Sequence, residues 1–310
     1  MTSRLAVPAV HGVLPVFQTP FHEDGEIDLG VLAKEIRWIL EQGADGVVMG
    51  MVSEILRLDD VEVTAVQGLA CTIALEHRAQ SVMSVGAEST HVAVQRARRA
   101  ADAGATALMA IPPLATAVDD DEKFAYYSAI FDAVDVPVVV QDASGYVGQP
   151  LSIAMQARIA HEFPDRAVFK PEAPPIGPRV SELLAATSSR ARILEGTGGV
   201  ALVDSYRRGI VGTMPGADIC WAIVALWQAL QLDDAGAVER ISLPLVDLVS
   251  LQTELDSFLA VEKRLLKRQG VFTNTAVRGP VGFHLTDAAA RQVDELFEAL
   301  QDAVALGESR

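Results

Sequence analysis

Short apolar runs alternate with longer amphipathic stretches along most of this chain. Runs that are apolar throughout are typical of strands buried on both faces, as in a parallel sheet, whereas spacing near 3.6 residues indicates helices. The predicted strands are Val13–Gln18, Gly46–Gly50, Ser81–Val85, Ala107–Ile111, Pro137–Gln141, Ala167–Lys170, Arg192–Glu195 and Ile210–Met214. The predicted helices are Asp28–Gln42, Val61–Glu76, His91–Ala103, Asp120–Val134, Ser152–Phe163, Pro178–Thr187, Ala201–Arg208 and Ala217–Leu232.

Eight strand–helix units in roughly 220 residues predict an α/β fold, a closed (β/α)8 TIM barrel. We expect residues 1–232 to form the barrel and residues 233–310 to form a C-terminal helical extension of the same domain. The extension contains Ala235–Arg268, with Pro244 as the expected point of any break, and Thr286–Leu306. The alternative is a doubly wound open sheet, which the absence of a GxGxxG motif after the first strand disfavours.

Turn and cap residues support these boundaries. Gly43, Gly104 and Gly209 follow predicted helices, where a left-handed C-terminal cap favours glycine. Asp28 and Ser152 stand at helix starts, where their side chains can accept hydrogen bonds from backbone amides.

Composition excludes several classes of function. The formal net charge of −16 argues against nucleic-acid binding and against attachment to anionic lipid. No long apolar run and no secretory leader is evident, so we expect no membrane association and a cytoplasmic location. Two distant cysteines and six histidines without metal-ligand spacing predict no disulfide framework, no metal and no cofactor.

Lys170 ends one of the buried apolar runs, Ala167–Lys170. A buried ammonium is costly unless it is paired or loses its proton, and a deprotonated lysine can form a Schiff base with a carbonyl substrate. The alternative is a strand-end lysine that extends to water. The other lysines, Lys34, Lys123, Lys263 and Lys267, occur in helix-like, charge-rich surroundings.

In a (β/α)8 barrel the chemistry gathers where the strands end, and several of these ends resemble one family. The chain resembles the dihydrodipicolinate synthase / N-acetylneuraminate lyase superfamily of Schiff-base barrels from Gly12 to Pro280. The matching segments are Thr19-Pro20-Phe21, Asp24-Gly25, Ile27-Asp28, Gly43-Ala44-Asp45-Gly46, Gly50-Met51-Val52-Ser53-Glu54, Lys170, Gly209-Ile210-Val211-Gly212 and Arg278-Gly279-Pro280. The resemblance implies a Schiff-base role for Lys170, a small-molecule 2-oxo acid substrate, and a homotetramer built as a dimer of dimers.

The chain departs from the synthases and lyases of that superfamily in their proton relay. Gln141 occupies the place of the relay tyrosine on the fifth strand, and Met51 or Val52 that of the relay threonine. Pro112-Pro113-Leu114 replaces the Pro-Tyr-Tyr that follows the fourth strand. A glutamine amide can hold an oxygen atom by hydrogen bonds but cannot carry protons near neutral pH.

Glu172 is the candidate acid–base group. It lies two residues beyond Lys170 in an extended segment, so both side chains should point to the same face. An apolar barrel mouth would raise the pKa of its carboxyl group towards the range useful for proton transfer. The alternatives are a plain ion pair with Lys170, or exposure to solvent.

The remaining candidates are substrate-binding residues. Ser53, Val52 and nearby amides would hold the substrate carboxylate, unless this segment is a plain turn. Gly196 and Thr197 would allow close approach of a ligand, although such a sequence is more often a tight turn, and Thr213 ends the eighth strand. Tyr146 either covers the site or packs as an ordinary loop residue.

A lysine Schiff base, an adjacent glutamate and no relay tyrosine suit elimination of water better than cleavage of a carbon–carbon bond. We therefore expect a lyase, a dehydratase of a 2-keto-3-deoxy sugar acid in carbohydrate catabolism. Gln141 and the Lys-x-Glu motif also resemble the L-2-keto-3-deoxyarabonate dehydratase branch, whose product is 2-oxoglutarate semialdehyde. The alternatives are a pyruvate-dependent aldolase of the same superfamily and a non-catalytic 2-oxo acid binding protein.

Overall fold

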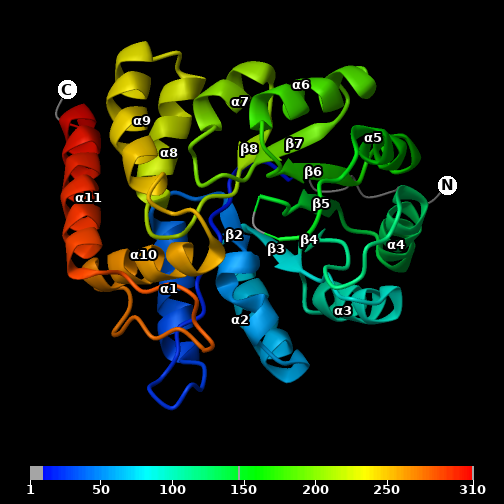
Figure 1. Cartoon of the computed structure of the whole chain (residues 1–310), viewed down its shortest axis with the longest axis horizontal. Coiled ribbons are helices and arrows are strands. Elements are labelled where there is room, and N and C mark those ends of the chain that lie inside the picture. Colours follow the sequence, from blue (N-terminus) through cyan, green and yellow to red (C-terminus); the bar gives the residue numbers. More distant parts are fainter. Residues whose placement is uncertain (1–9, 146, 309–310) are drawn as a thin grey trace.

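Eight parallel strands form a barrel in the computed structural model, which describes residues 10–145 and 147–308 (Figure 1). Neighbouring strands follow chain order from β2 to β8, and β1 pairs with β8. β1 and β2 meet through a bridge between Val16 and Val48, which closes the ring. The strands are β1 Gly12–Val13, β2 Gly46–Val48, β3 Gln80–Ser84, β4 Ala107–Ala110, β5 Val138–Asp142, β6 Ala167–Pro171, β7 Arg192–Glu195 and β8 Gly212–Thr213.

Helices surround this barrel, as the sequence predicts, and confirm the (β/α)8 fold (Figure 1). They are α1 Leu29–Glu41, α2 Asp60–Glu76, α3 Thr90–Asp102, α4 Asp120–Ala133, α5 Ile153–Glu162, α6 Ile176–Ala186, α7 Leu202–Arg208 and α8 Cys220–Gln231. Two short 3-10 helices, η1 Met51–Ser53 and η2 Ile55–Arg57, lie between β2 and α2. No helix in the described ranges is long and apolar enough to cross a membrane.

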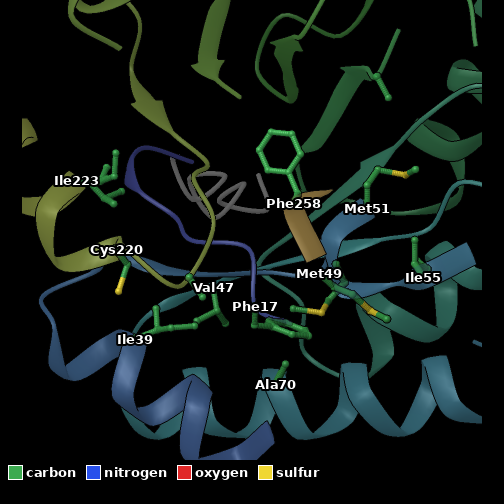
Figure 2. Close-up of a cluster of buried hydrophobic side chains, with 14 of the residues drawn as sticks. Phe17, Ile39, Val47, Met49, Met51, Ile55, Ala70, Cys220, Ile223 and Phe258 are labelled. Atoms are coloured by element: carbon green, nitrogen blue, oxygen red, sulfur yellow. The ribbon is translucent and has the colours of Figure 1, made fainter. Parts of the chain in front are cut away.

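Alternation along the strands divides the core into two layers. Val139 belongs to a cluster inside the barrel, whereas its neighbours Val138 and Val140 pack between the barrel and the helices. Successive strand residues point to opposite faces, so continuously apolar strands supply both layers. Figure 2 shows part of the outer layer, where Phe17 and Val47 lie over the helices that carry Ala70 and Ile39.

The predicted caps and turns are present. Asp28 accepts a hydrogen bond from the Val31 amide at 2.9 Å, and Ser152 accepts one from the Met155 amide at 3.1 Å. Gly43, Gly104 and Gly209 have φ values of +88°, +93° and +98°, which a residue with a Cβ rarely adopts. These features fix where α1, α3, α5 and α7 begin or end.

The first and eighth strands are shorter than predicted. β1 ends at Val13 because Pro15, which has no amide hydrogen, interrupts the regular ladder. The chain nevertheless continues along the barrel wall, since the Val16 amide donates to Pro215 O at 2.8 Å. The ends of β1 and β8 therefore still reach the mouth of the barrel.

Three helices follow the barrel: α9 Ala235–Val249, α10 Leu255–Arg268 and α11 Asp287–Glu308. The expected helix break near Pro244 is wrong, because Pro244 lies inside α9. The helix instead ends at Val249, and residues 250–254 separate it from α10. Ser257 determines this boundary: its hydroxyl oxygen accepts hydrogen bonds from the amides of Thr253 and Glu254 at 2.9 and 3.0 Å. α10 thereby starts anew and packs against η1 at the barrel mouth.

Candidate active site

A cavity lies at the carboxyl ends of the strands. The ends of β1, β2 and β5 to β8 contribute to its wall, and α10 contributes the rest. Its lining residues are Val16, Met51, Val52, Gln141, Lys170, Glu172, Gly196, Gly198, Met214, Pro215, Gly216, Leu255, Phe258 and Glu262. Most of these side chains are apolar, so the few polar groups among them determine what the cavity can bind and do.

Lys170 and Glu172 meet in this cavity. Lys170 lies on β6 and Glu172 directly follows that strand; each residue is only 4 % exposed. Lys170 Nζ lies 3.0 Å from Glu172 Oε1. The two-residue spacing therefore places both side chains on one face. The alternatives in which Lys170 extends to water or Glu172 faces solvent are excluded, whereas the plain ion pair is compatible with this contact.

Gln141 holds the other oxygen of the same carboxyl group. Gln141 lies opposite Lys170 in the β5–β6 ladder, and its Nε2 donates to Glu172 Oε2 at 2.7 Å. Glu172 is thus bound through both oxygens, and its orientation towards the amine is fixed. This contact makes Gln141 a positioning residue for Glu172, a role that the sequence did not predict.

Burial raises the pKa of Glu172, although the nearby Lys170 amine and the Gln141 amide oppose the shift. The negative charge of Glu195 adds to the increase. A carboxyl group with a raised pKa exchanges its proton more readily near neutral pH than an ordinary glutamate does. Glu172 can therefore accept a proton from the Lys170 ammonium, which must lose one before the amine attacks a ketone.

Gly196 gives the Lys170 side chain its space. A methyl group at Gly196 would lie 2.5 Å from Lys170 Cε and 2.9 Å from Glu172 Cγ, far inside van der Waals contact. Gly196 follows β7, and its backbone lines the cavity. The groups that approach Gly196 are thus the Lys170 and Glu172 side chains, and the predicted close approach of a ligand stays a prediction.

Of the two residues predicted to bind the substrate carboxylate, Val52 and Ser53, one lies on the cavity wall. Val52 lines the cavity. Ser53 is fully buried, and its hydroxyl donates to Phe17 O at 2.6 Å while it accepts from the Gly50 amide at 3.0 Å. Ser53 therefore shapes the loop that presents Val52, and its direct contact with a substrate stays a prediction.

The two predicted threonines converge on Glu195 at the end of β7. The Thr197 amide donates to Glu195 Oε1 at 2.6 Å, and the Thr197 hydroxyl also donates to this atom. The Thr213 hydroxyl donates to Glu195 Oε2 at 2.7 Å. Neither threonine is among the described residues that line the cavity, so a substrate-binding role for them remains a prediction.

Lys263 is a second buried lysine, which its charge-rich sequence context does not indicate. Its side chain is 0 % exposed and forms an ion pair with Glu54. Lys263 Nζ also donates to Thr19 O at 2.8 Å and to Ala276 O at 2.7 Å. Because these acceptors surround the ammonium group, Lys263 joins α10 to the barrel mouth rather than facing the cavity.

Sequence reasoning also missed the residues that α10 brings to the site. Leu255, Phe258 and Glu262 line the cavity although they lie far beyond the last strand in the chain. Figure 2 shows the ring of Phe258 at the edge of the buried cluster that includes Met51, a second cavity-lining residue. Their spacing along one helix face is the only sequence signal, and it is equally typical of an ordinary core helix.

Two further expectations concern a metal site and Tyr146. Across the described ranges no group of three or more His, Cys, Asp or Glu side chains is arranged to hold a metal ion. Tyr146, considered above as a cover for the site, lies outside the described residues.

Residues 9–300 match the family model described as the dihydrodipicolinate synthetase family. Among curated proteins, the L-2-keto-3-deoxyarabonate dehydratase of Azospirillum brasilense is 29 % identical over 292 residues, 91 % of each chain. A 4-hydroxy-tetrahydrodipicolinate synthase of Acidothermus cellulolyticus is 26 % identical and covers 98 % of this chain and 96 % of its own length.

Comparison with solved structures indicates the same family. The crystal structure of dihydrodipicolinate synthase from Rhodopseudomonas palustris superposes with a TM-score of 0.84 at 27 % identity, covering 94 % of this chain and 98 % of that chain. The superfamily resemblance inferred from the sequence is thereby confirmed. The relatives include both a dehydratase and several synthases, so they leave the substrate open.

Proposed function

This chain belongs to the dihydrodipicolinate synthetase family and is a lyase, and we propose that it removes water from a 2-keto-3-deoxy sugar acid. The proposed substrate is L-2-keto-3-deoxyarabonate, and the proposed product is 2-oxoglutarate semialdehyde. The observation that carries the proposal is the contact of Glu172 with both Lys170 and Gln141. A base is thus held beside the amine, and the described residues that line the cavity include no tyrosine.

In the first step Lys170 forms an imine with the C2 ketone. Glu172 takes a proton from the Lys170 ammonium, and the free amine attacks C2. Glu172 then returns this proton to the carbinolamine hydroxyl group, which leaves as water, so Glu172 is again a carboxylate and the resulting protonated imine draws electrons from C3. The apolar cavity wall favours this step because it excludes bulk water that would hydrolyse the imine early.

In the second step Glu172 removes a proton from C3. Its Oε1 lies 3.0 Å from the Lys170 nitrogen, so the carbon atoms next to the imine carbon fall within its reach. The raised pKa of Glu172 makes its carboxylate a stronger base than an ordinary glutamate. Loss of the C3 proton gives an enamine, and the enamine expels the hydroxyl group from C4.

Elimination fits this geometry better than the aldol cleavage considered above. Cleavage requires a base at the C4 hydroxyl, more distant from the imine than C3 is. Glu172 lies against the nitrogen that forms the imine, and the Gln141 amide holds it there. This placement supports proton removal at C3.

The test is a comparison of Glu172→Gln with the unmodified enzyme. The amide keeps the size of the side chain but cannot act as a base. We expect the variant still to form a borohydride-reducible adduct at Lys170, more slowly because water must take the ammonium proton, while its dehydration rate falls by about 10²- to 10⁴-fold. Normal turnover by the variant would refute the base role, and release of pyruvate from the unmodified enzyme would indicate an aldolase instead.

We also propose that the chain assembles as a homotetramer, as the superfamily resemblance implies, and that it is cytoplasmic, as its composition suggests. Light scattering of the purified protein tests the assembly. A monomeric mass at micromolar concentration would contradict it.

A further inference from the structure

Glu262 is a second carboxyl group on the wall of the Lys170 cavity. It comes from α10, is 3 % exposed, and lines the same cavity as Lys170 and Glu172. The elimination described above uses only Glu172 and leaves Glu262 without a role. A buried carboxyl group on the wall of this cavity requires an explanation, because burying a carboxyl group is costly.

Two other polar side chains converge on Glu262. Gln18 Nε2 donates a hydrogen bond to Glu262 Oε2. A methyl group at Gly216 would lie 2.5 Å from Glu262 Oε1 and 2.8 Å from Asp218 Oδ1, so both carboxyl oxygens approach the same point. Carboxyl groups that converge in this way do not both ionise readily, and at least one tends to keep its proton.

A third carboxyl group completes the cluster. Glu35 of α1 is 0 % exposed, and its Oε1 accepts from the Gln18 amide at 2.8 Å. Within the described chain, Glu35 Oε2 and Asp218 Oδ2 have no hydrogen-bond partner. The nearby cation, Lys263, is paired with Glu54. Neutralisation by protons is therefore the route open to this cluster.

The pKa values of the three groups agree with that conclusion. Burial raises the pKa of Glu262 well above its ordinary range, and the neighbouring Asp218 and Glu35 raise it further. Burial also raises the pKa of Glu35 and brings that of Asp218 to about 7. Burial and the neighbouring carboxyl groups thus favour the protonated form of Glu262 on the cavity wall, whereas two hydrogen-bond donors favour the ionised form of Glu172.

We propose that Glu262 is the general acid that protonates the hydroxyl group leaving from C4. This inference rests on the proposed dehydration. Hydroxide is a poor leaving group, and a proton supplied as the C4–O bond breaks allows it to leave as water. Glu172 carries the C3 proton at that moment, so a separate acid lets proton removal and proton donation occur at different groups.

Each proton that Glu172 and Glu262 transfer during one turnover is returned by its end. The C3 proton passes to Glu172, the C4–O bond breaks, and the oxygen leaves with the Glu262 proton as water. The conjugated iminium then loses a C5 proton to the Glu262 carboxylate, which restores the acid. Glu172 returns its proton to C3, the enol at C4–C5 becomes the aldehyde, and water releases the product from Lys170.

The experiment separates proton removal from loss of the leaving group. Pyruvate forms the same imine and can exchange its C3 hydrogens with deuterated water, but it has no hydroxyl to lose. We expect Glu262→Gln to exchange pyruvate hydrogens within about twofold of the unmodified enzyme while dehydration of 2-keto-3-deoxyarabonate falls at least about 100-fold. Glu239→Gln, at an exposed residue of α9 outside the cluster and the cavity, should retain both reactions.

The possible results distinguish failure of the Glu262 inference from failure of the proposed function. Dehydration at the normal rate by Glu262→Gln, or equal loss of exchange and dehydration, would overturn the inference. An unmodified enzyme that neither exchanges pyruvate hydrogens nor dehydrates the sugar acid would overturn the proposed function, and the inference with it. If Glu262→Gln does not fold, Glu262→Asp keeps an acid one methylene further away, and the same split between slow dehydration and retained exchange is expected.

Discussion

Gln141 Nε2 donates to Glu172 Oε2 at 2.7 Å, so a residue at the end of β5 orients the carboxyl group that follows β6. This hydrogen bond favours the ionised form of Glu172 and lowers its pKa against the larger effect of burial. An amide at this position can therefore orient Glu172 without transferring a proton.

Replacing Gln141 by leucine should shift the pH dependence of turnover. Glu172 must be ionised to act as a base, and loss of the hydrogen bond raises its pKa, so the acidic limb of kcat should move to higher pH. The profile of Gln141→Leu measured from pH 5 to pH 9 checks this. Gln95→Leu, at an exposed residue of α3, should not move the limb; an unchanged limb in Gln141→Leu would contradict the positioning role.

Gly196→Ala should inactivate the enzyme while leaving it folded. The added methyl group would lie 2.5 Å from Lys170 Cε, so the amine must move away from Glu172. We expect at least about a tenfold loss of kcat/KM, since small misplacement of reacting groups has large effects on rate. Gly68→Ala is the matched control, because a methyl group there meets no atom within 4 Å and the change favours helix α2.

Glu54→Gln should destabilise the fold strongly. The substitution leaves the Lys263 ammonium buried without its carboxylate, a change that typically costs about 3–5 kcal/mol. Unfolding in urea measures the loss. Asp204→Asn breaks the exposed ion pair with Arg208 and should destabilise the protein much less. Equal losses in both variants would show that the buried ion pair stabilises the fold no more than the exposed one does.

Asp218 should make stability depend on pH. Its pKa rises from the ordinary 3.8 to about 7 in the folded protein, chiefly because of burial. Its stabilising contribution is complete below about pH 4 and is lost as the pH rises to about 7, because the unfolded chain releases the proton first. Asp218→Asn should remove this loss.

Urea midpoints from pH 4 to pH 8 test the Asp218 prediction. The stability of the unmodified protein relative to the variant should fall over that range and become constant above it. Asp102→Asn, at the exposed end of α3, should follow the unmodified protein. Parallel curves for the Asp218 variant and the unmodified protein would contradict the prediction.

The barrel was predictable because its signals are local. Continuously apolar strands such as Ala107–Ala110 and caps such as Asp28 depend on neighbouring residues, and the structure confirms them. The boundary before α10 was missed, since Ser257 caps the helix from inside a polar stretch where Pro244 gave the more obvious signal. A proline can lie within a helix when surrounding contacts hold it, so the residue type alone misplaced the break.

The Lys170–Glu172 contact was predictable for a similar reason, since residues two apart in a strand share a face. The burial of Lys263 and the approach of Glu262 were not, because both depend on how α10 returns over the barrel mouth. Thr197 and Thr213 lie at the expected strand ends, but their hydroxyls bind Glu195. The places of these residues at the strand ends were thus predictable from the sequence, whereas the groups that their side chains contact were not.

Mass spectrometry of the protein after borohydride reduction with 2-keto-3-deoxyarabonate tests the central claim most directly. Lys263 is an internal control, since it is even more buried than Lys170 but is not among the described residues that line the cavity. The account predicts one substrate-derived adduct per chain, on the peptide that contains Lys170. An adduct on Lys263 or another lysine, or normal product formation with no adduct at Lys170, would contradict it.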